Sequence, residues 1–152
     1  MSEVTIALES PRPDAVRRLV RDLDAYLAAL YPAESNHLLD VDALAAPDVR
    51  FFVARRAGDP IGCGALRIDR AGYGEIKRMF VTPAARGCSL GRRLLDAVEA
   101  EARAAGLGWL RLETGIHQPE ALGLYRAAGY VARGPFGPYG PDPLSVFMEK
   151  AL

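Results

Sequence analysis

The chain has 152 residues, of which 50% are hydrophobic and 25% are charged, and this predicts one domain over residues 1–152 with a substantial core. Its 19 basic and 19 acidic residues cancel, which argues against a nucleic-acid-binding surface and against bulk attraction to an anionic membrane. Two cysteines make no disulfide framework, and neither a signal-peptide pattern nor a membrane-length apolar run is present, so we expect a cytoplasmic protein.

The first half of the chain predicts a strand, a helix and then three strands. Val4–Leu8 favours a strand, and from Asp14 apolar residues recur at helical spacing until Tyr31-Pro32 ends the pattern. A short helix is expected within residues 40–46. Three further runs, separated by tight turns, predict an antiparallel meander over residues 49–56, 61–69 and 73–81.

The second half alternates helices and strands. After Pro83 an amphipathic helix carries one apolar stripe of Leu90, Leu94, Leu95, Val98 and Ala102, with most charged residues off it. The remaining elements are a strand at 109–114, a helix at 119–128, a strand at 130–133, a Pro/Gly-rich loop at 134–143 and a strand at 144–149. This order predicts an α/β (α+β) fold with a mixed, mostly antiparallel sheet of about seven strands flanked by about four helices.

A loop between strand and helix, residues 86–91, has the features of a phosphate cradle. Backbone N–H groups at a helix start lack intrahelical acceptors, and the helix dipole favours an anion there. Gly87 and Gly91 let the backbone approach a ligand closely. A P-loop would need Gly-Lys-Ser/Thr, which is absent, and a dinucleotide fold would need a parallel sheet. A plain helix-initiating turn is the other interpretation.

Two motifs together resemble the GNAT superfamily of N-acetyltransferases. Arg86 to Gly91 is similar to its Arg/Gln-x-x-Gly-x-Gly/Ala signature, and residues 121–130 are similar to its Leu-Tyr-x-x-x-Gly-Phe/Tyr motif. The element order matches along nearly the whole chain. One residue departs from the pattern, because Ser89 stands where the signature has glycine; its hydroxyl could cap the helix or touch a phosphate oxygen.

The resemblance implies an acyl-CoA N-acyltransferase fold that binds acetyl-CoA and needs no metal. It implies that the fourth and fifth strands splay apart and that the pantetheine arm bonds to the exposed strand edge. Gln118 is either a cofactor contact or a plain helix-entry residue before Pro119. The residues expected to bind the cofactor are Met79, Phe80, Val81, Arg86, Gly87, Cys88, Ser89, Leu90, Gly91, Arg92 and Gln118.

Two residues are expected to carry proton transfers. The resemblance implies that Tyr125 protonates the departing thiolate, and a phenol with a pKa of about 10 suits that role. The alternative is a core tyrosine that shares a helix face with Leu122. Glu75 is the expected base that deprotonates the amine, on a strand face shared with Lys77 and Met79. Its alternative is a solvated residue near the start of the strand, paired with Arg67 or Lys77.

Two segments are expected to shape the acceptor pocket. By the resemblance, these are the loop around Phe136 and Tyr139 and the segment Tyr26–Asp42, whose acidic residues would suit a cationic amine. The alternatives are a stiff connector for the first and a solvated loop for the second. His37 and His117 lack metal-ligand spacing. We therefore expect an N-acetyltransferase that moves an acetyl group to a primary amine of a small molecule or protein in a ternary complex, with homodimerisation possible. The alternative function is a non-catalytic acyl-CoA-binding regulatory domain.

Overall fold

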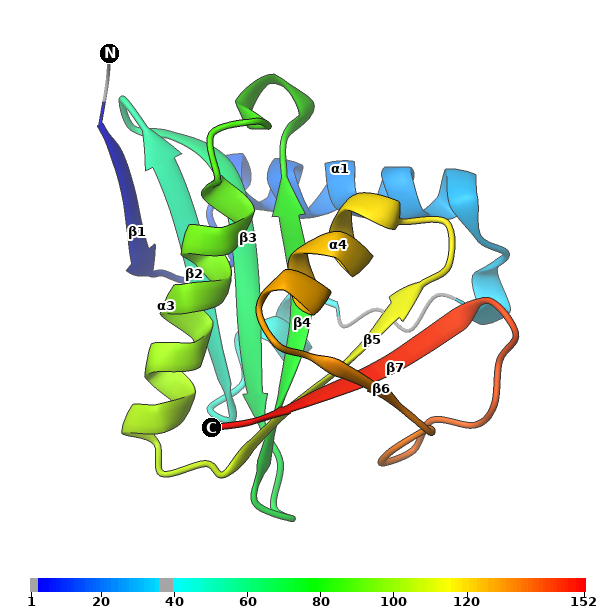
Figure 1. Cartoon of the computed structure of the whole chain (residues 1–152). Helices are drawn as coiled ribbons and strands as arrows, with labels where there is room; N and C mark the ends of the chain where they lie inside the picture. The colour runs from blue at the N-terminus through cyan, green and yellow to red at the C-terminus, as the bar shows by residue number, and fades with distance from the viewer. Residues whose placement is uncertain (1–2, 36–39) are drawn as a thin grey trace.

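A seven-stranded sheet covered by helices on both faces forms the part of the chain that this computed structural model describes, residues 3–35 and 40–152 (Figure 1). His37 lies outside the described residues. The strands are β1 (Val4–Leu8), β2 (Val49–Arg56), β3 (Asp59–Ile68), β4 (Tyr73–Val81), β5 (Trp109–Gly115), β6 (Val131–Arg133) and β7 (Ser145–Ala151). The α-helices are α1 (Asp14–Leu30), α2 (Val41–Leu44), α3 (Leu90–Ala104) and α4 (Pro119–Ala127). The predicted fold class and element order are confirmed.

The strand order is β1-β2-β3-β4-β5-β7-β6. Strands β1 to β4 form the predicted antiparallel meander, and β5, β7 and β6 form a second antiparallel group. Only β4 and β5 pair in parallel among the described strands, and α3 supplies the crossover that such a pair needs. The sheet therefore consists of two antiparallel halves joined along β4 and β5.

Two strands are longer than predicted because of pairing across the sheet. β3 begins at Asp59, which pairs with Arg56 across the turn. β7 continues to Ala151, which pairs with Trp109 at the start of β5. The hydrophobic pattern of a single segment does not reveal which strand it will pair with. The sequence therefore predicted Asp59 within the turn and Ala151 beyond the end of the last strand.

Helices α3 and α4 cover the sheet face that is nearer the viewer in Figure 1. The apolar stripe of α3 is buried as predicted, and each buried leucine contributes about 1.5–3 kcal/mol. Glu99 of α3 is buried as well, although it was expected with the charged residues off the stripe. Its carboxylate accepts hydrogen bonds from Tyr130 Oη at 2.8 Å and Lys150 Nζ at 3.0 Å. These partners offset the cost of burying its charge.

Helices α1 and α2 cover the opposite face. Val16, Leu19, Val20 and Leu23 of α1 pack against β2, β3 and Phe80 of β4. Residue Tyr31 ends α1 in an extended conformation, one residue before Pro32. The two faces thus carry separate cores, and α1 runs behind the N-terminal end of β3 and the C-terminal end of β4, at the top of Figure 1.

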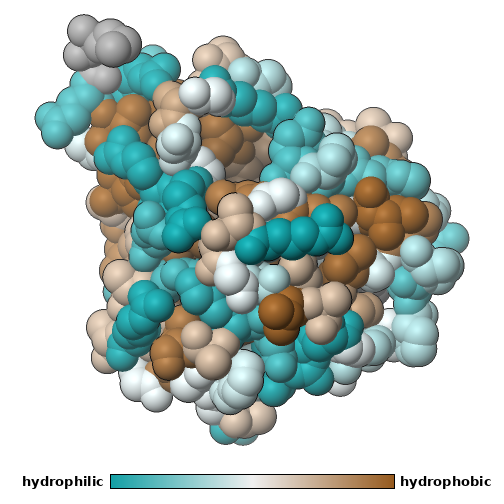
Figure 2. Space-filling model, in the orientation of Figure 1, coloured by the Kyte–Doolittle hydropathy of each residue, from teal (hydrophilic) through white to brown (hydrophobic). Residues whose placement is uncertain are grey.

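A small aromatic cluster holds the Pro/Gly-rich loop before β7 against the sheet. The ring centroid of Phe136 lies 5.1 Å from that of Tyr139, 5.7 Å from that of Tyr73 and 5.9 Å from that of Phe147. The loop is therefore anchored rather than a loose connector. On the face shown in Figure 2, polar and apolar residues form a mosaic with no single continuous apolar patch.

Candidate active site

The separation of β4 from β5 creates the candidate active site. The two strands pair only from Tyr73 with Trp109 to Ile76 with Leu112, although β4 continues to Val81 and β5 to Gly115. A bulge in β4 accompanies the separation, because the register with β3 shifts and Arg78 adopts a φ of 58°. The strands thus splay apart, as the family resemblance implies.

The bulge reverses the alternation of side chains along β4. Phe80 packs in the core under α1, whereas Met79 packs in the core under α3. Arg78 forms an ion pair with Asp24 of α1. The expectation that Met79 shares a strand face with Glu75 and Lys77 is therefore wrong, because an extra residue in one strand turns every later side chain to the other face.

A cavity of about 430 Å³ lies between the start of α3, the end of β4 and the first turns of α4, and we call it the cofactor cavity. Ten of the eleven residues expected to bind the cofactor line it: Met79, Phe80, Val81, Arg86, Gly87, Ser89, Leu90, Gly91, Arg92 and Gln118. Cys88 does not line this cavity, because its Sγ donates to the carbonyl oxygen of Ala85 at 2.9 Å.

The loop before α3 presents free backbone donors at the cofactor cavity. Within the described residues, no backbone acceptor reaches the N–H groups from Gly87 through Arg92, and the first helical bond runs from Arg93 to Ser89. Gly87 has a φ of 89°, and a Cβ there would meet no atom within 4 Å. A run of unpaired donors at the positive end of a helix, with two arginines beside it, fits a diphosphate.

The hydroxyl of Ser89 does not cap α3. Ser89 is the N-cap residue of α3 with a left-handed φ of 60°, and its side chain makes no capping hydrogen bond. The backbone thus keeps the conformation that glycine adopts freely, at a steric cost for serine. Of the two roles considered for the Ser89 hydroxyl, helix capping is wrong and contact with a phosphate oxygen stays a prediction; its N–H remains among the free donors.

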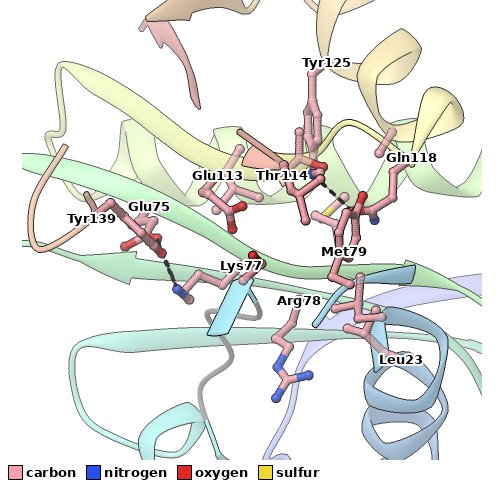
Figure 3. Close-up of a pocket in the computed structure, with 17 residues that line it drawn as sticks. Leu23, Glu75, Lys77, Arg78, Met79, Glu113, Thr114, Gln118, Tyr125 and Tyr139 are labelled. Carbon is pink, nitrogen blue, oxygen red and sulfur yellow. Dashed lines mark hydrogen bonds and ion pairs between the residues drawn. The ribbon is translucent and has the colours of Figure 1, made fainter. Parts of the chain in front are cut away.

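A second, smaller cavity of about 90 Å³ lies beside the first, between the separated parts of β4 and β5, and we call it the acceptor-side cavity (Figure 3). Glu75, Lys77, Glu113, Thr114 and Tyr139 contribute most of its polar wall. Five residues line both cavities: Leu23, Met79, Gln118, Ala121 and Tyr125. The two spaces therefore adjoin around the tyrosine of the second motif.

Tyr125 stands on α4 at the boundary between the two cavities. In Figure 3 it descends from α4 towards Thr114 and Met79. Its side chain is buried, and its ring meets Tyr130 edge to face at 5.7 Å. Burial, with a smaller contribution from Glu113, raises the pKa of Tyr125 above its ordinary value. The phenol therefore keeps its proton at neutral pH and can act as a donor.

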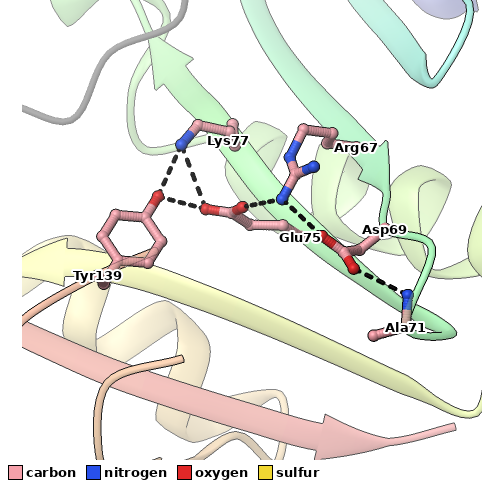
Figure 4. A network of polar contacts seen from close by, with 6 residues as sticks. All are labelled: Arg67, Asp69, Ala71, Glu75, Lys77 and Tyr139. Carbon is pink, nitrogen blue, oxygen red and sulfur yellow. Dashed lines mark hydrogen bonds and ion pairs between the residues drawn. The ribbon is translucent and has the colours of Figure 1, made fainter. Parts of the chain in front are cut away.

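Glu75 lies in a network of charged groups at the other end of the acceptor-side cavity (Figure 4). Its Oε1 accepts from Arg67 Nη2 at 3.1 Å, and its Oε2 accepts from Lys77 Nζ at 3.2 Å and from the hydroxyl of Tyr139. Lys77 also donates to Tyr139 Oη at 2.7 Å. Both pairings of the alternative for Glu75 are present, but its side chain is buried, so the expectation of a solvated residue is wrong. Its role as a base stays a prediction.

Glu113 of β5 is a candidate residue that the sequence interpretation missed. It lies one residue beyond the last pair of β4 with β5, and Ser145 Oγ donates to its Oε2 at 2.8 Å. Burial raises the pKa of Glu113 to about 7, because the charged form loses hydration. The sequence did contain one indication of this residue: a carboxylate lies between Leu112 and Thr114, near the end of a strand expected to be buried.

Gln118 holds the start of α4 against the end of β5. Its Oε1 accepts from the Gly115 N–H at 3.2 Å and from Tyr31 Oη at 3.2 Å. Tyr31 Oη in turn accepts from the His117 N–H at 3.0 Å, and the two rings stack with centroids 5.5 Å apart. Gln118 thus supports the separated end of β5 while it lines both cavities.

Neither a metal centre nor a membrane span is found in the part of the chain that the structure describes. Over residues 3–35 and 40–152, no three His, Cys, Asp or Glu side chains gather where they could hold a metal ion. In the same residues, no helix has the length and apolarity to cross a bilayer. Cys63 is fully buried, and burial raises the pKa of its thiol to about 12, so it is no nucleophile at neutral pH.

Comparison with known proteins gives one consistent result. Residues 16–130 match the model of the family described as Acetyltransferase (GNAT) family. An IAA acetyltransferase from Azospirillum brasilense is 64% identical over 153 residues and covers 100% of both chains.

Solved structures agree with that match. A Klebsiella pneumoniae structure assigned to the acyl-CoA N-acyltransferases is 41% identical, covers 98% of this chain and 97% of its own, and superposes with a TM-score of 0.83. PaiA N-acetyltransferase from Thermoplasma acidophilum, crystallised in complex with coenzyme A, is 18% identical, covers 99% of both chains and has a TM-score of 0.76. At that identity the second likeness concerns the fold alone.

Proposed function

Because the chain belongs to the GNAT acetyltransferase family and is an acetyl-CoA-dependent N-acyltransferase, we propose that it transfers the acetyl group to a primary amine of a small molecule or protein by direct attack in a ternary complex. The relative that is 64% identical carries the name IAA acetyltransferase, so IAA is one acceptor to test.

The observation that supports direct attack is the shared wall of the two cavities. Tyr125, Met79 and Gln118 line both, so a thioester in the larger space and an amine in the smaller one would meet beside the tyrosine. Fixing two reactants in this way can lower the barrier by roughly 7–11 kcal/mol in the best cases. Cys88 is turned towards Ala85 and away from this point, which disfavours an acyl-cysteine intermediate.

The cofactor cavity offers distinct contacts for each part of acetyl-CoA, the acyl donor. The free N–H groups from Gly87 through Arg92 would hold the pyrophosphate. Arg86 lies over the ring of Tyr26, 5.7 Å from its centroid, and donates Nε to the carbonyl of Val81 at 3.1 Å. It would thereby brace the loop against the end of β4. The backbone of Met79 to Val81 would receive the pantetheine arm.

Tyr125 is the proposed general acid. As the C–S bond breaks, its hydroxyl would donate a proton to the thiolate, and the proton released from the attacking nitrogen would restore the phenol. Such proton transfer is typically worth a factor of 10²–10⁴ in rate. A backbone N–H of the bulged part of β4 would stabilise the oxyanion.

Two measurements test this function. Calorimetry should detect acetyl-CoA binding by the purified protein, and free-thiol release should then identify an acceptor among alkylamines, peptides with free amino groups and IAA. Tyr125→Phe should lower kcat at least 100-fold and leave acetyl-CoA affinity within about threefold.

Tyr130→Phe is the matched control for Tyr125→Phe. Tyr130 contacts the Tyr125 ring but bonds Glu99 and lines neither cavity, so kcat should stay near the wild-type value. Wild-type turnover by Tyr125→Phe would remove the tyrosine from the mechanism, and absence of acetyl-CoA binding would refute the cofactor cavity.

A further inference from the structure

Glu113 lines the acceptor-side cavity at the point where β4 and β5 separate. It follows Leu112, the last residue of β5 that pairs with β4, so its side chain stands in the gap between the strands. Figure 3 shows its carboxylate between the Glu75, Lys77 and Tyr139 group on one side and Thr114 on the other. Within the described residues, the Glu113 carboxylate accepts one hydrogen bond, from Ser145 Oγ at 2.8 Å.

Glu75 is less suited to receive a proton, although it lines the same cavity. Each of its oxygens accepts from a cation, and its side chain is 3% exposed. Protonation would remove two ion pairs, to Arg67 and Lys77, and would leave the part-buried Lys77 without a carboxylate partner, which costs several kcal/mol. The network of Figure 4 therefore acts as a fixed wall.

The ion-paired residues around the cavity, three cations and three carboxylates, balance one another without Glu113. Arg67 pairs with Asp69 and Glu75, Lys77 pairs with Glu75, and Arg78 pairs with Asp24. An ionised Glu113 thus adds one uncompensated negative charge that a single ammonium group would neutralise. An acceptor with a carboxylate beside its nitrogen would bring back a negative charge where every cation of this wall is already engaged.

The remaining surroundings of Glu113 agree with this charge count. Burial and two neighbouring acids raise its pKa to about 7, while Ser145 and Lys77 act in the opposite direction. Titratable or polar groups face Glu113 from every element packed around it. They are Glu75 and Lys77 of β4, Ser145 of β7, Asp142 of the loop before β7, Tyr125 of α4, Tyr31 at the end of α1 and Tyr139 of the aromatic loop. Burial keeps the three tyrosines neutral, whereas the charge of Glu113 changes near pH 7.

The size and apolar lining of the cavity limit the shape of the acceptor. Its volume is about 90 Å³, and Leu23, Leu27, Ala121 and Leu144 contribute aliphatic surface. This space suits an aminoalkyl chain of a few carbon atoms and leaves bulkier parts of an acceptor outside.

We propose, on the basis of the acetyltransferase function above, that Glu113 binds the acceptor's ammonium group and takes its proton, and that it thereby selects slender primary amines with no anionic group beside the nitrogen. The ammonium would transfer one proton to the carboxylate. The neutral amine then forms the C–N bond as the C–S bond breaks, and the thiolate gains its proton from Tyr125. The proton on Glu113 leaves to solvent, so each turnover releases one proton, with the amide and free coenzyme A.

The test compares pentylamine with norleucine, its α-carboxylated counterpart, as acceptors for the full-length protein. Wild-type kcat/KM should be at least tenfold higher for pentylamine. It should rise with pH through about 7 and level off before the pKa of the amine near 10, because binding of the ammonium needs an ionised Glu113.

Two variants separate a catalytic role from a structural one. Glu113→Gln should lower kcat/KM at least 100-fold and abolish the step near pH 7, while acetyl-CoA affinity stays unchanged. Ser145→Ala should move that step to higher pH, because it removes the donor that stabilises the ionised carboxylate.

The outcomes distinguish this inference from the proposed function. A wild type that binds acetyl-CoA and acetylates amines, with Glu113→Gln equally active and the same pH step, overturns the role of Glu113 alone. Preference for norleucine, or no turnover of pentylamine, overturns the proposed selectivity. Absence of turnover with every amine refutes the proposed function itself.

Discussion

Tyr31 at the end of α1 contacts Gly115 at the end of β5 so closely that adding one methyl group at Gly115 should strongly lower the stability of the protein. An ideal Cβ on Gly115 would lie 1.8 Å from Tyr31 Oη and 2.1 Å from Tyr31 Cζ. Tyr31 is buried, and its hydroxyl bonds His117 and Gln118. Gly115→Ala must therefore displace the tyrosine, because no small rotation clears both atoms.

The magnitude follows from two contributions. Overpacking of a filled site costs about 1–3 kcal/mol, and each of the two hydrogen bonds of Tyr31 contributes about 0.5–1.5 kcal/mol. The free energy of unfolding should thus fall by about 2–6 kcal/mol. Because Gln118 bonds both Gly115 and Tyr31 and lines both cavities, acetyl-CoA should also bind more weakly.

Urea unfolding of Gly115→Ala, Tyr31→Leu and the double variant measures this effect. In the Tyr31→Leu protein, the added methyl should cost less than about 1 kcal/mol, because the clashing ring is gone. Gly123→Ala serves as the control for the glycine change itself: a Cβ there meets nothing within 4 Å, and a helical alanine should stabilise by about 0.5–1 kcal/mol. Equal costs of Gly115→Ala with and without Tyr31 would refute the contact.

Three further predictions concern charge, the loop and the core. Glu113 keeps its proton to about pH 7 in the folded protein but loses it near pH 4.3 in the unfolded chain, so the stability it contributes is present below pH 4.3 and lost as pH rises to about 7. The free energy of unfolding of the wild type, measured against Glu113→Gln in urea, should fall by up to about 3 kcal/mol over this window, and a constant difference would contradict the buried position. Gly87→Glu should abolish acetyl-CoA binding in calorimetry, because the new side chain adds bulk and negative charge to the cofactor cavity. Gly72→Glu is the control: Gly72 has a φ of 92°, close to the 89° of Gly87, but does not line either cavity, so this variant should bind acetyl-CoA normally. Tyr130→Phe should lower the free energy of unfolding by about 1.5–3 kcal/mol, because buried Glu99 loses a donor at 2.8 Å, and thermal unfolding at wild-type temperature would rule out that bond.

Much of the fold could be predicted because its signals are local. The apolar stripe of α3, the turns of the meander and the Pro32 stop after α1 each reside within a few residues of chain, and all are found in the structure. The loop at 86–91 and the tyrosine at 125 were placed on a strand–helix junction and a helix in the same way. Local patterns thus predicted the element order and the sheet class, and the family resemblance implied ten of the residues that line the cofactor cavity.

The tertiary structure decided the charges and directions within the site. The bulge at Arg78 turned Met79 to the other face, and Glu75 gained partners from β3 and from Tyr139, far along the chain. Glu113 owes its raised pKa to burial between elements that its neighbours in sequence do not reveal. Periodicity is a property of a short segment, whereas desolvation and ion pairing depend on which distant segments the fold brings together. The sequence by itself therefore predicted where the candidate site lies, and only the folded chain decided which carboxylate of the described residues lines it without an ion pair.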